Sequence, residues 1–295
     1  MTVKTGLVTV LFNSASVLPG FFESMSKQNM QDYWLFIIDN SLDDRSYTEA
    51  EKLIAKYGFE NVTLIHNTSN VGVAAANNQG INLSLEMGCE YVLLLNNDIE
   101  FKNPDLLGEM LALADTRQER MIVPKIYFFD SGKIWCAGGS FNRWIGTTNH
   151  TGEGEKDAGQ YDKDGYTEYA PTCFMLIHRS VFDAVGIMDE KYFVYHDDTD
   201  FVWRAGLAGY KVYYWAAGQV WHKVSSSTGG GTSPFSIYYG HRNRIYFINK
   251  NFSPIHKIVA FTYFSLTRLL KWRLFTKKLF SSFYRGTRDG LKMKP

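Results

Sequence analysis

The feature that most constrains the fold of this chain is the stretch of residues 91–98, which reads Tyr-Val-Leu-Leu-Leu-Asn-Asn-Asp. Five consecutive apolar or aromatic residues predict a strand buried on both faces, as in the centre of a parallel sheet. The strand then ends in Asn96, Asn97 and Asp98. Ligands of open α/β sheets bind beyond the carboxyl ends of the strands, where Asp98 would suit a divalent cation that also holds phosphate oxygens. The alternative is that Asp98 caps the next helix, near Pro104.

Strands and helices alternate along the first hundred residues. The patterns predict strands at residues 6–12, 34–38 and 62–66, and helices at 17–25, 49–57 and 70–87. This alternation is typical of a mostly parallel, doubly wound α/β sheet with right-handed crossovers. Asn13 and Asp39 end two of these strands, so we expect them to lie at the same edge as Asp98. The small residues around Gly72 would let a ligand approach the backbone, but they lack the GxGxxG spacing of dinucleotide-binding enzymes.

The second half of the chain contains a concentrated acidic turn. Strands are predicted at residues 123–129, 172–178 and 211–217, with a helix at 180–185. Asp197, Asp198 and Asp200 then fall within four residues, and such carboxylates repel one another unless a metal, a cation or protonation relieves them. Neighbouring aromatic residues favour a partly buried site over a solvated acidic turn. His222 precedes a segment rich in Ser and Gly, residues 225–233, which is either a lid beside a metal site or a plain linker.

Charge is distributed unevenly along the chain. The 295 residues carry a net charge of +1, but residues 255–295 hold ten Lys or Arg against Asp289 alone, which gives +9 there and leaves −8 elsewhere. A basic tail on an acidic body predicts an anionic surface as partner. Three widely separated cysteines fit a reducing cytosol, and the amino terminus does not have the pattern of a signal peptide.

Several segments, taken together and in order, resemble the family 2 glycosyltransferases, which have the GT-A fold. They are Val-Leu-Phe-Asn at 10–13, Ile-Asp-Asn-Ser at 38–41, residues 70–80, Leu-Leu-Asn-Asn-Asp at 94–98, residues 186–190, residues 195–204 and His-Lys at 222–223. Within the family, the Leu-Asn-Asn-Asp form, Trp-Cys-Ala-Gly-Gly at 135–139 and residues 239–243 are similar to bacterial rhamnosyltransferases of O-antigen and cell-wall polysaccharide assembly.

The resemblance implies an inverting, metal-dependent transfer of a sugar from a nucleoside-diphosphate donor to a hydroxyl of a lipid-linked saccharide. It implies Asp98 and His222 as ligands of Mg²⁺ or Mn²⁺, and Asp198 as general base with Asp197 beside it. The donor site would be formed by Asn13, Asp39, Asn70, Asn78 and Asn97. Asp200 and Arg204 would support the acceptor site. The sequence departs from the family at two positions. Asn96 replaces the first Asp of the Asp-x-Asp metal motif, and Asp197 replaces the Glu of a Glu-Asp pair, so either acid could be the base.

The chain is expected to form a GT-A catalytic domain over residues 1–250, with a donor half at about 1–100 and an acceptor half at about 101–250, followed by a helical segment at 251–295. Over residues 255–283 apolar and basic residues interleave, and no run approaches the ~20 apolar residues of a membrane-spanning helix. This predicts a basic amphipathic helix in the membrane interface, with a helix packed on the catalytic domain as the alternative. The expected location is cytoplasmic, on the inner face of the cell membrane, and no nucleic-acid motif accompanies the tail.

Other functions remain open at this point. The donor is expected to be dTDP-rhamnose, with UDP-hexose or a galactofuranose donor as alternatives. A nucleotidyltransferase shares the parallel sheet and the metal carboxylates, but residues 12–16 lack the glycine-rich loop with Arg or Lys that such enzymes carry after the first strand. A non-catalytic subunit that binds a sugar nucleotide is the competing function outside enzymes.

Overall fold

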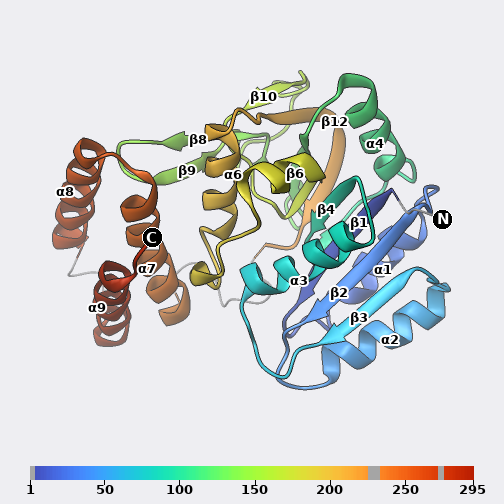
Figure 1. Cartoon of the computed structure of the whole chain (residues 1–295), viewed down its shortest axis with the longest axis horizontal. Coiled ribbons are helices and arrows are strands. Elements are labelled where there is room, and N and C mark those ends of the chain that lie inside the picture. The colour runs from blue at the N-terminus through green and yellow to red at the C-terminus, as the bar shows by residue number, and fades with distance from the viewer. Residues whose placement is uncertain (1–3, 225–232, 272–275) are drawn as a thin grey trace.

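A mixed sheet runs through the centre of the computed structural model, which describes residues 4–224, 233–271 and 276–295 (Figure 1). Its strands are ordered β10-β12-β6-β11-β4-β1-β2-β3, and β5 and β7 add to β12 and β6. The strands are β1 (Thr5–Leu11), β2 (Tyr33–Asp39), β3 (Val62–His66), β4 (Tyr91–Leu95), β5 (Ile99–Glu100), β6 (Met121–Phe128), β7 (Ile134–Cys136), β10 (Gly165–Thr167), β11 (Phe174–His178) and β12 (Val212–His222). A separate hairpin consists of β8 (Gly139–Asn142) and β9 (Thr147–His150).

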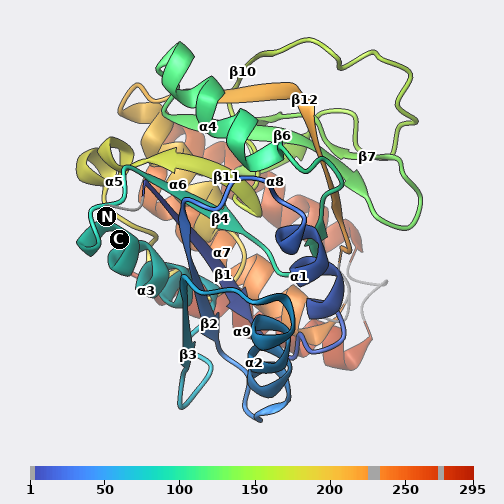
Figure 2. The same ribbon diagram turned by 90° about the vertical axis from the view of Figure 1, so that its right-hand side faces the viewer.

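The first four strands form the predicted parallel sheet, with β1 between β2 and β4. Alternate side chains of these strands face opposite layers. Leu7 and Leu93 pack with α1 (Leu18–Ser26), α2 (Arg45–Tyr57) and α4 (Leu106–Arg117). Val8 and Leu94 pack with α3 (Val73–Glu86), α5 (Arg179–Val185) and α6 (Asp197–Leu207), on the other side of the sheet (Figure 2). β4 is therefore buried on both faces, as its apolar sequence predicts.

Two strands of the second half differ from the expectation. The predicted strand at 172–178 forms as β11, but it runs antiparallel to both of its neighbours, β4 and β6. The predicted strand at 211–217 continues as β12 to His222, because the pairing with β6 shifts register between Trp215 and Gln219 and then resumes. The direction of β11 was not predicted because an apolar pattern does not encode strand direction. The length of β12 was underestimated because a local irregularity interrupts the pattern without ending the strand. His222 is therefore the last residue of a sheet strand.

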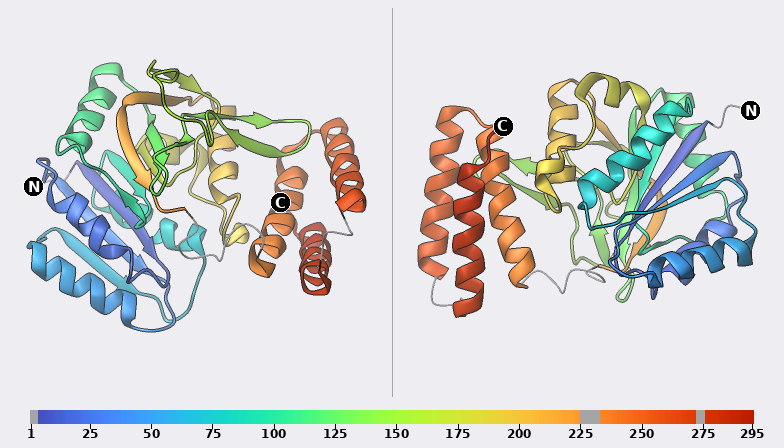
Figure 3. Two further views of the ribbon diagram at one scale, coloured as in Figure 1. Left: turned by 180° about the vertical axis from the view of Figure 1, so that it is seen from behind. Right: turned by 60° about the horizontal axis from the view of Figure 1, so that its bottom comes forward.

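Three helices stand beside the sheet at the carboxyl end of the chain (Figure 3). They are α7 (Pro234–Asn251), α8 (Pro254–Lys271) and α9 (Lys277–Lys292). The segment 255–283, predicted as amphipathic helix, is divided between two helices, because α8 ends and a new helix with Thr276 as its N-cap begins within that range. The predicted boundary at residue 250 falls at the end of α7, which packs against α9, and the division into two domains stays a prediction.

Some of the residues discussed above lie outside the described part of the chain. These are most of the Ser- and Gly-rich segment, residues 225–232, and residues 272–275 of the predicted amphipathic helix. Among the helices that the structure describes, none has both the length and the apolar composition needed to cross a membrane.

Candidate active site

Polar residues from the ends of three neighbouring strands converge at one edge of the sheet, as predicted. Leu11 at the end of β1 lies in register with Asp39 at the end of β2, and β4 pairs with β1 on its other side. The side chain of Asn97 donates a hydrogen bond to the carbonyl oxygen of Val10, which ties the turn after β4 to β1. The three strand ends therefore form one surface, which the parallel register makes unavoidable.

Asp98 and His222 meet at this edge although 123 residues separate them in the sequence. Asp98 precedes the short strand β5, which pairs with the end of β12 so that Ile99 lies opposite His222. This pairing brings His222 Nε2 to 3.1 Å from Asp98 Oδ1. The next helix, α4, begins only at Leu106, so the alternative that Asp98 caps a helix is wrong.

The pair offers a carboxylate oxygen and an imidazole nitrogen to a cation. His222 Nδ1 is buried and has no hydrogen-bond partner among the described residues, so the ring is not committed to the protein through that atom. No group of three or more potential ligand side chains occurs in the described part of the chain. Two protein ligands still fit Mg²⁺ or Mn²⁺ at a nucleotide site, because such ions take their remaining ligands from phosphate oxygens and water.

The two adjacent acids at the start of α6 have different environments. Asp197 is buried, and this burial, together with the neighbouring charge of Asp198, raises the pKa of Asp197 to about 7. Asp198 is half-buried, and its carboxylate accepts hydrogen bonds from the Tyr169 hydroxyl (2.8 Å) and the Thr199 amide (2.6 Å). Asp198 is thus the more accessible acid and is held in one orientation, as a general base must be.

A chain of aromatic rings connects Asp198 with the Asp98–His222 pair. The ring of Tyr169 stacks on that of His150, with centroids 6.0 Å apart, and His150 meets Trp135 at 4.6 Å. Trp135 in turn lies 4.6 Å from His222. His150 and Trp135 come from β9 and β7, so strands of the second half line the space between the proposed metal ligands and the proposed base. Burial lowers the pKa of His150, which favours its neutral form.

The loop before α6 has an unusual backbone. Phe193, Tyr195 and His196 all have positive φ, near +65°, a conformation that side chains other than glycine rarely adopt. Phe193 packs directly over Gly72, where an added Cβ would lie 2.7 Å from the Phe193 carbonyl oxygen. Phe193 therefore occupies the space on this side of Gly72, and the close approach of a ligand to the backbone of this helix start stays a prediction.

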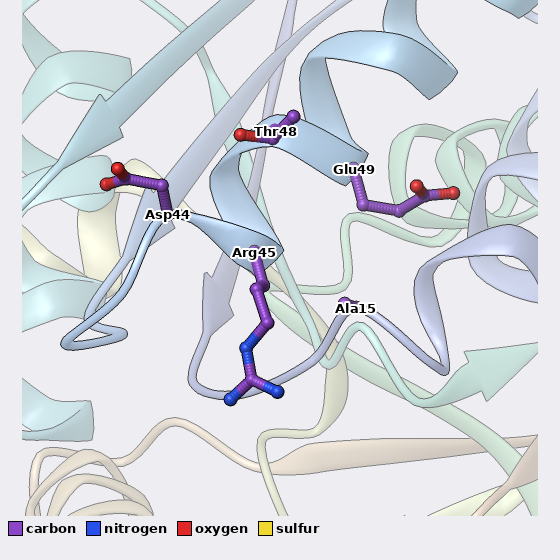
Figure 4. Close-up of a pocket in the computed structure, with 5 residues that line it drawn as sticks. All are labelled: Ala15, Asp44, Arg45, Thr48 and Glu49. Atoms are coloured by element: carbon purple, nitrogen blue, oxygen red, sulfur yellow. The ribbon is translucent and has the colours of Figure 1, made fainter.

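On the donor side, three predicted residues lie around the strand ends. Asn13 is exposed, whereas Asp39 is buried and accepts a hydrogen bond from the Ser41 amide. Asn70 accepts one from the Gly72 amide and shapes the turn into α3. Nearby, a depression of about 470 Å³ is lined by Ala15, Asp44, Arg45, Thr48 and Glu49. Figure 4 shows Arg45 and Glu49 extending from the start of α2, with Ala15 across from them.

Four other predicted residues have protein partners. Asn78 is buried and bonds the backbone of Met188 through both its amide oxygen and its nitrogen. Asn97 is bonded to Val10, as described above. Asp200 pairs with Arg204, whose guanidinium also donates to the carbonyl oxygens of Val185 and Ile187. These contacts tie Asn78, Asp200 and Arg204 to the protein itself, which is what a supporting position requires.

The comparisons with known proteins agree with this geometry. The chain belongs to glycosyl transferase family 2, whose model matches residues 7–186. It is 25% identical over 243 residues to the dTDP-rhamnosyl transferase RfbF of Shigella flexneri, covering 80% of this chain and 77% of that protein. It is also 25% identical over 211 residues to the low-salt glycan biosynthesis hexosyltransferase Agl10 of Haloferax volcanii, covering 70% and 66% of the two chains. The protein is therefore a glycosyltransferase that resembles rhamnosyltransferases.

Solved structures show the same fold. Residues 1–349 of TarS from S. aureus in complex with UDP superpose with a TM-score of 0.60 at 15% identity, over 93% of this chain and 75% of that one. GalNAc-T7 with UDP, GalNAc and Mn²⁺ gives a TM-score of 0.63 at 14% identity, over 83% and 47%. Both are GT-A glycosyltransferases, so the predicted GT-A fold is confirmed.

Sequence reasoning did not assign a role to Tyr169, His150 or Asn243. Trp135 and Asn243 entered as parts of the segments 135–139 and 239–243 that carry the resemblance, without a role. None of these residues carries a spacing signal, because each reaches the site through a contact between segments far apart in the sequence. A lone aromatic residue in an irregular loop is indistinguishable from a core residue until the fold is known.

Substitutions of Asp197 and Asp198 are expected to have different consequences. We expect Asp198→Asn to lower the transfer rate by ~10²–10⁴-fold with donor binding preserved, because a general base is lost.

Asp197→Asn should lower transfer less. It should also raise the melting temperature relative to wild type above pH 7, because burial of a carboxyl with a raised pKa costs stability progressively as pH rises from about 4 through about 7. Single-turnover transfer and thermal unfolding at pH 4.5 and pH 8 measure both effects. A dead Asp197→Asn beside an active Asp198→Asn would exchange the roles.

Tyr169→Phe should slow transfer about 10-fold without weakening donor binding, since one hydrogen bond to a charged group is worth ~1.5–3 kcal/mol. The matched control is Tyr166→Phe. Tyr166 is an exposed residue of β10, and the substitution removes a hydroxyl that donates a hydrogen bond to Glu119. Steady-state kinetics of both variants checks this. Equal rates for the two variants would show that Tyr169 does not orient Asp198.

Proposed function

We propose that this glycosyltransferase is an inverting, metal-dependent enzyme that uses a nucleoside-diphosphate sugar and glycosylates a hydroxyl of a lipid-linked saccharide. The observation that carries the proposal is the Asp98–His222 pair, joined to Asp198 through Trp135, His150 and Tyr169. One end of this arrangement offers cation ligands and the other offers a base. A transfer that inverts configuration needs these two functions on opposite sides of the reacting carbon.

The residues of the chain divide the work as follows. Asp198 takes the proton from the attacking hydroxyl, while Tyr169 and the Thr199 amide hold its carboxylate in place. A cation held by Asp98 and His222 would neutralise charge that develops on the departing diphosphate. Asp39, Asn13 and Asn70 lie at the ends of β1 and β2 and before α3, where the nucleotide of the donor would be bound. Trp135 and His150 border the space in which the sugar would lie.

The identity of the donor rests on the relatives. RfbF is named as a dTDP-rhamnosyl transferase, which favours dTDP-rhamnose, whereas TarS was crystallised with UDP. A thermal-shift panel of dTDP-, UDP- and GDP-sugars with Mn²⁺ distinguishes these donors, since a specific ligand stabilises the folded protein by mass action. Stabilisation only by UDP-hexoses would replace rhamnose as the donor sugar. Tight binding without transfer to any lipid-linked acceptor would favour the non-catalytic subunit.

Asp98→Ala should abolish stabilisation by donor plus Mn²⁺ and reduce transfer by at least ~100-fold, while the melting temperature of the free protein changes little. Asp98 lies at a strand end and is not part of the apolar core, so its truncation opens no large cavity there. The control is Glu100→Ala, two residues after Asp98. This substitution removes the ion-pair partner of Lys223 and should leave the Asp98–His222 pair intact. Full activity of Asp98→Ala, or of wild type stripped of metal by EDTA, would contradict the metal assignment.

We also propose that the carboxyl-terminal helices bind an anionic membrane surface. One side of α8 is packed against α7 through Ala260 and Phe264. The other side exposes an apolar stripe with three- and four-residue spacing, formed by Ile255, Ile258, Val259, Tyr263, Leu266 and Leu270. On α9 and the residues after it, Lys277, Lys278, Arg285, Arg288, Lys292 and Lys294 outnumber the single acid Asp289. An apolar stripe beside a basic helix suits the interface of anionic lipids.

Ile258→Glu combined with Leu266→Glu should reduce binding of the full-length chain to vesicles that contain about 30% anionic lipid by at least ~10-fold. Leu42→Glu is the control, because Leu42 is 77% exposed but lies on the loop before α2, far from α8. Vesicle co-sedimentation measures the binding, which should fall as salt rises because charge attraction is screened over ~10 Å. Equal binding to neutral and anionic vesicles, or no effect of the double substitution, would contradict the membrane proposal.

A further inference from the structure

Among the contacts of helix α7 with the loop that precedes the two acids is the buried side-chain amide of Asn243. Asn243 has no exposed surface, and its side-chain nitrogen lies within hydrogen-bond distance of three carbonyl oxygens. These belong to Tyr192 (2.8 Å), Val194 (2.6 Å) and Tyr195 (2.9 Å). The amide thus gathers the backbone of one loop around one point, and the loop leads directly into Asp197 and Asp198.

This loop needs an external restraint. Phe193, Tyr195 and His196 have positive φ, and residues with side chains keep such conformations only where their surroundings impose them. The loop contains no glycine that would adopt the conformation without strain. Without the bonds from Asn243, the backbone would relax toward the ordinary α or β regions, and the start of α6 would move with it.

Further contacts hold the loop from both sides. Arg242, the neighbour of Asn243, donates to the carbonyl oxygens of Lys191 (2.7 Å) and Tyr192 (2.6 Å). On the opposite side, the amide of Val73, at the first turn of α3, donates to the carbonyl oxygen of Phe193 (2.6 Å). The loop is therefore clamped between α3, which borders the donor side, and α7.

Helix α9 fixes α7 in turn. Gly286 and Gly290 lie so close to α7 that an added Cβ would stand 2.4 Å from the Tyr238 carbonyl oxygen and 2.5 Å from that of Arg242. The Tyr238 hydroxyl also donates to Asp289 (3.0 Å). The second glycine contact is at Arg242, adjacent to Asn243. The last helix of the chain thus supports the turn of α7 that holds the loop.

We propose that Asn243 is a positioning residue for the transfer reaction, which sets the place of Asp198 by fixing the backbone of residues 192–196. The inference rests on the proposed function for its kinetic consequence and on the backbone geometry for the rest. It makes the carboxyl-terminal helices part of the active-site framework. A truncation of the tail therefore removes more than a membrane contact, because it withdraws α9 from the helix that holds the loop.

Asn243→Ala is the direct test, and Arg244→Ala is its matched control. Arg244 is the next residue of α7, is also buried, and donates to a carbonyl oxygen, that of Ile145 in the β8–β9 turn. We expect Asn243→Ala to lower kcat by ~10–100-fold with the donor KM within about twofold of wild type, as displacement of a catalytic group by about 1 Å does. Arg244→Ala should retain kcat within about threefold. If Asn243→Ala does not fold, Arg242→Ala removes two of the loop contacts from the less buried side.

Hydrogen–deuterium exchange provides a second measurement that does not depend on activity. Peptides that cover residues 190–200 should exchange faster in Asn243→Ala than in wild type. In Arg244→Ala their exchange rate should equal that of wild type. Equal loss of kcat in the two variants, or unaltered exchange of the loop in Asn243→Ala, would overturn the proposal. If wild type transfers no sugar at all, the proposed function fails, whereas the exchange comparison still decides whether Asn243 fixes the loop.

Discussion

The carboxylate of Asp200 imposes a constraint on the whole second half of the molecule. It is fully buried, and burying an uncompensated charge costs several kcal/mol, so partners must surround it. Arg204 Nε lies 2.7 Å from it and Lys250 Nζ 2.9 Å, and Asn251 and Tyr192 donate further hydrogen bonds. These partners come from α6, the end of α7 and the short 3-10 helix at 190–192. Separating α7 from α6 would leave this charge buried without Lys250, at a cost of ~3–5 kcal/mol.

The same ion cluster joins the donor side to the carboxyl-terminal helices. Lys250 also contacts Asp189, which accepts a second hydrogen bond from the Tyr246 hydroxyl. One residue earlier in the chain, Met188 is bonded through its backbone to Asn78 of α3. The segment around residues 188–192 is thus anchored to α3 on one side and to α7 on the other. Helices from the first and last parts of the sequence are held against one short segment, and that segment leads into the loop that precedes Asp197 and Asp198.

The part of this arrangement that could be predicted from sequence is the part encoded by local patterns. Uninterrupted apolar runs that end in Asn or Asp identify β1, β2 and β4, and parallel pairing then brings their ends together. The antiparallel direction of β11 could not be predicted, because an apolar run packs equally well in either direction. Tyr169 and Asn243 were also missed, since each acts on a segment that is distant in the sequence. Asp98 and His222 were paired through the family resemblance, and the structure supplies the physical reason, which is the short strand β5 beside the end of β12.

In the carboxyl-terminal helices, an amphipathic sequence pattern does not by itself distinguish a buried helix face from an exposed one. Interleaved apolar and basic residues predict a helix in the membrane interface, but a helix face is apolar for either of two reasons: it packs on the protein, or it is exposed. Phe264 packs against His241 of α7 and is buried, whereas Leu266, two residues later, is 54% exposed. The break between α8 and α9 lets one helix carry the exposed apolar stripe while the other approaches α7 through glycines. The proposed membrane binding and the proposed support of the loop at residues 192–196 are therefore compatible, because different faces of the tail would perform them.

The adjacent acids at the start of α6 illustrate how burial can assign roles to identical side chains. Two carboxylates one residue apart do not both ionise without cost, and the protein relieves the repulsion by burying Asp197 and raising its pKa. Asp198 is the less buried of the two, and its oxygens accept hydrogen bonds from the Tyr169 hydroxyl and the Thr199 amide. An oriented and accessible carboxylate beside a buried one suits the base that we propose for a sugar hydroxyl. The carboxyl of Asp197 lies against the first backbone amides of α6, those of Asp197 and Asp198, and these hydrogen bonds oppose part of the rise in its pKa.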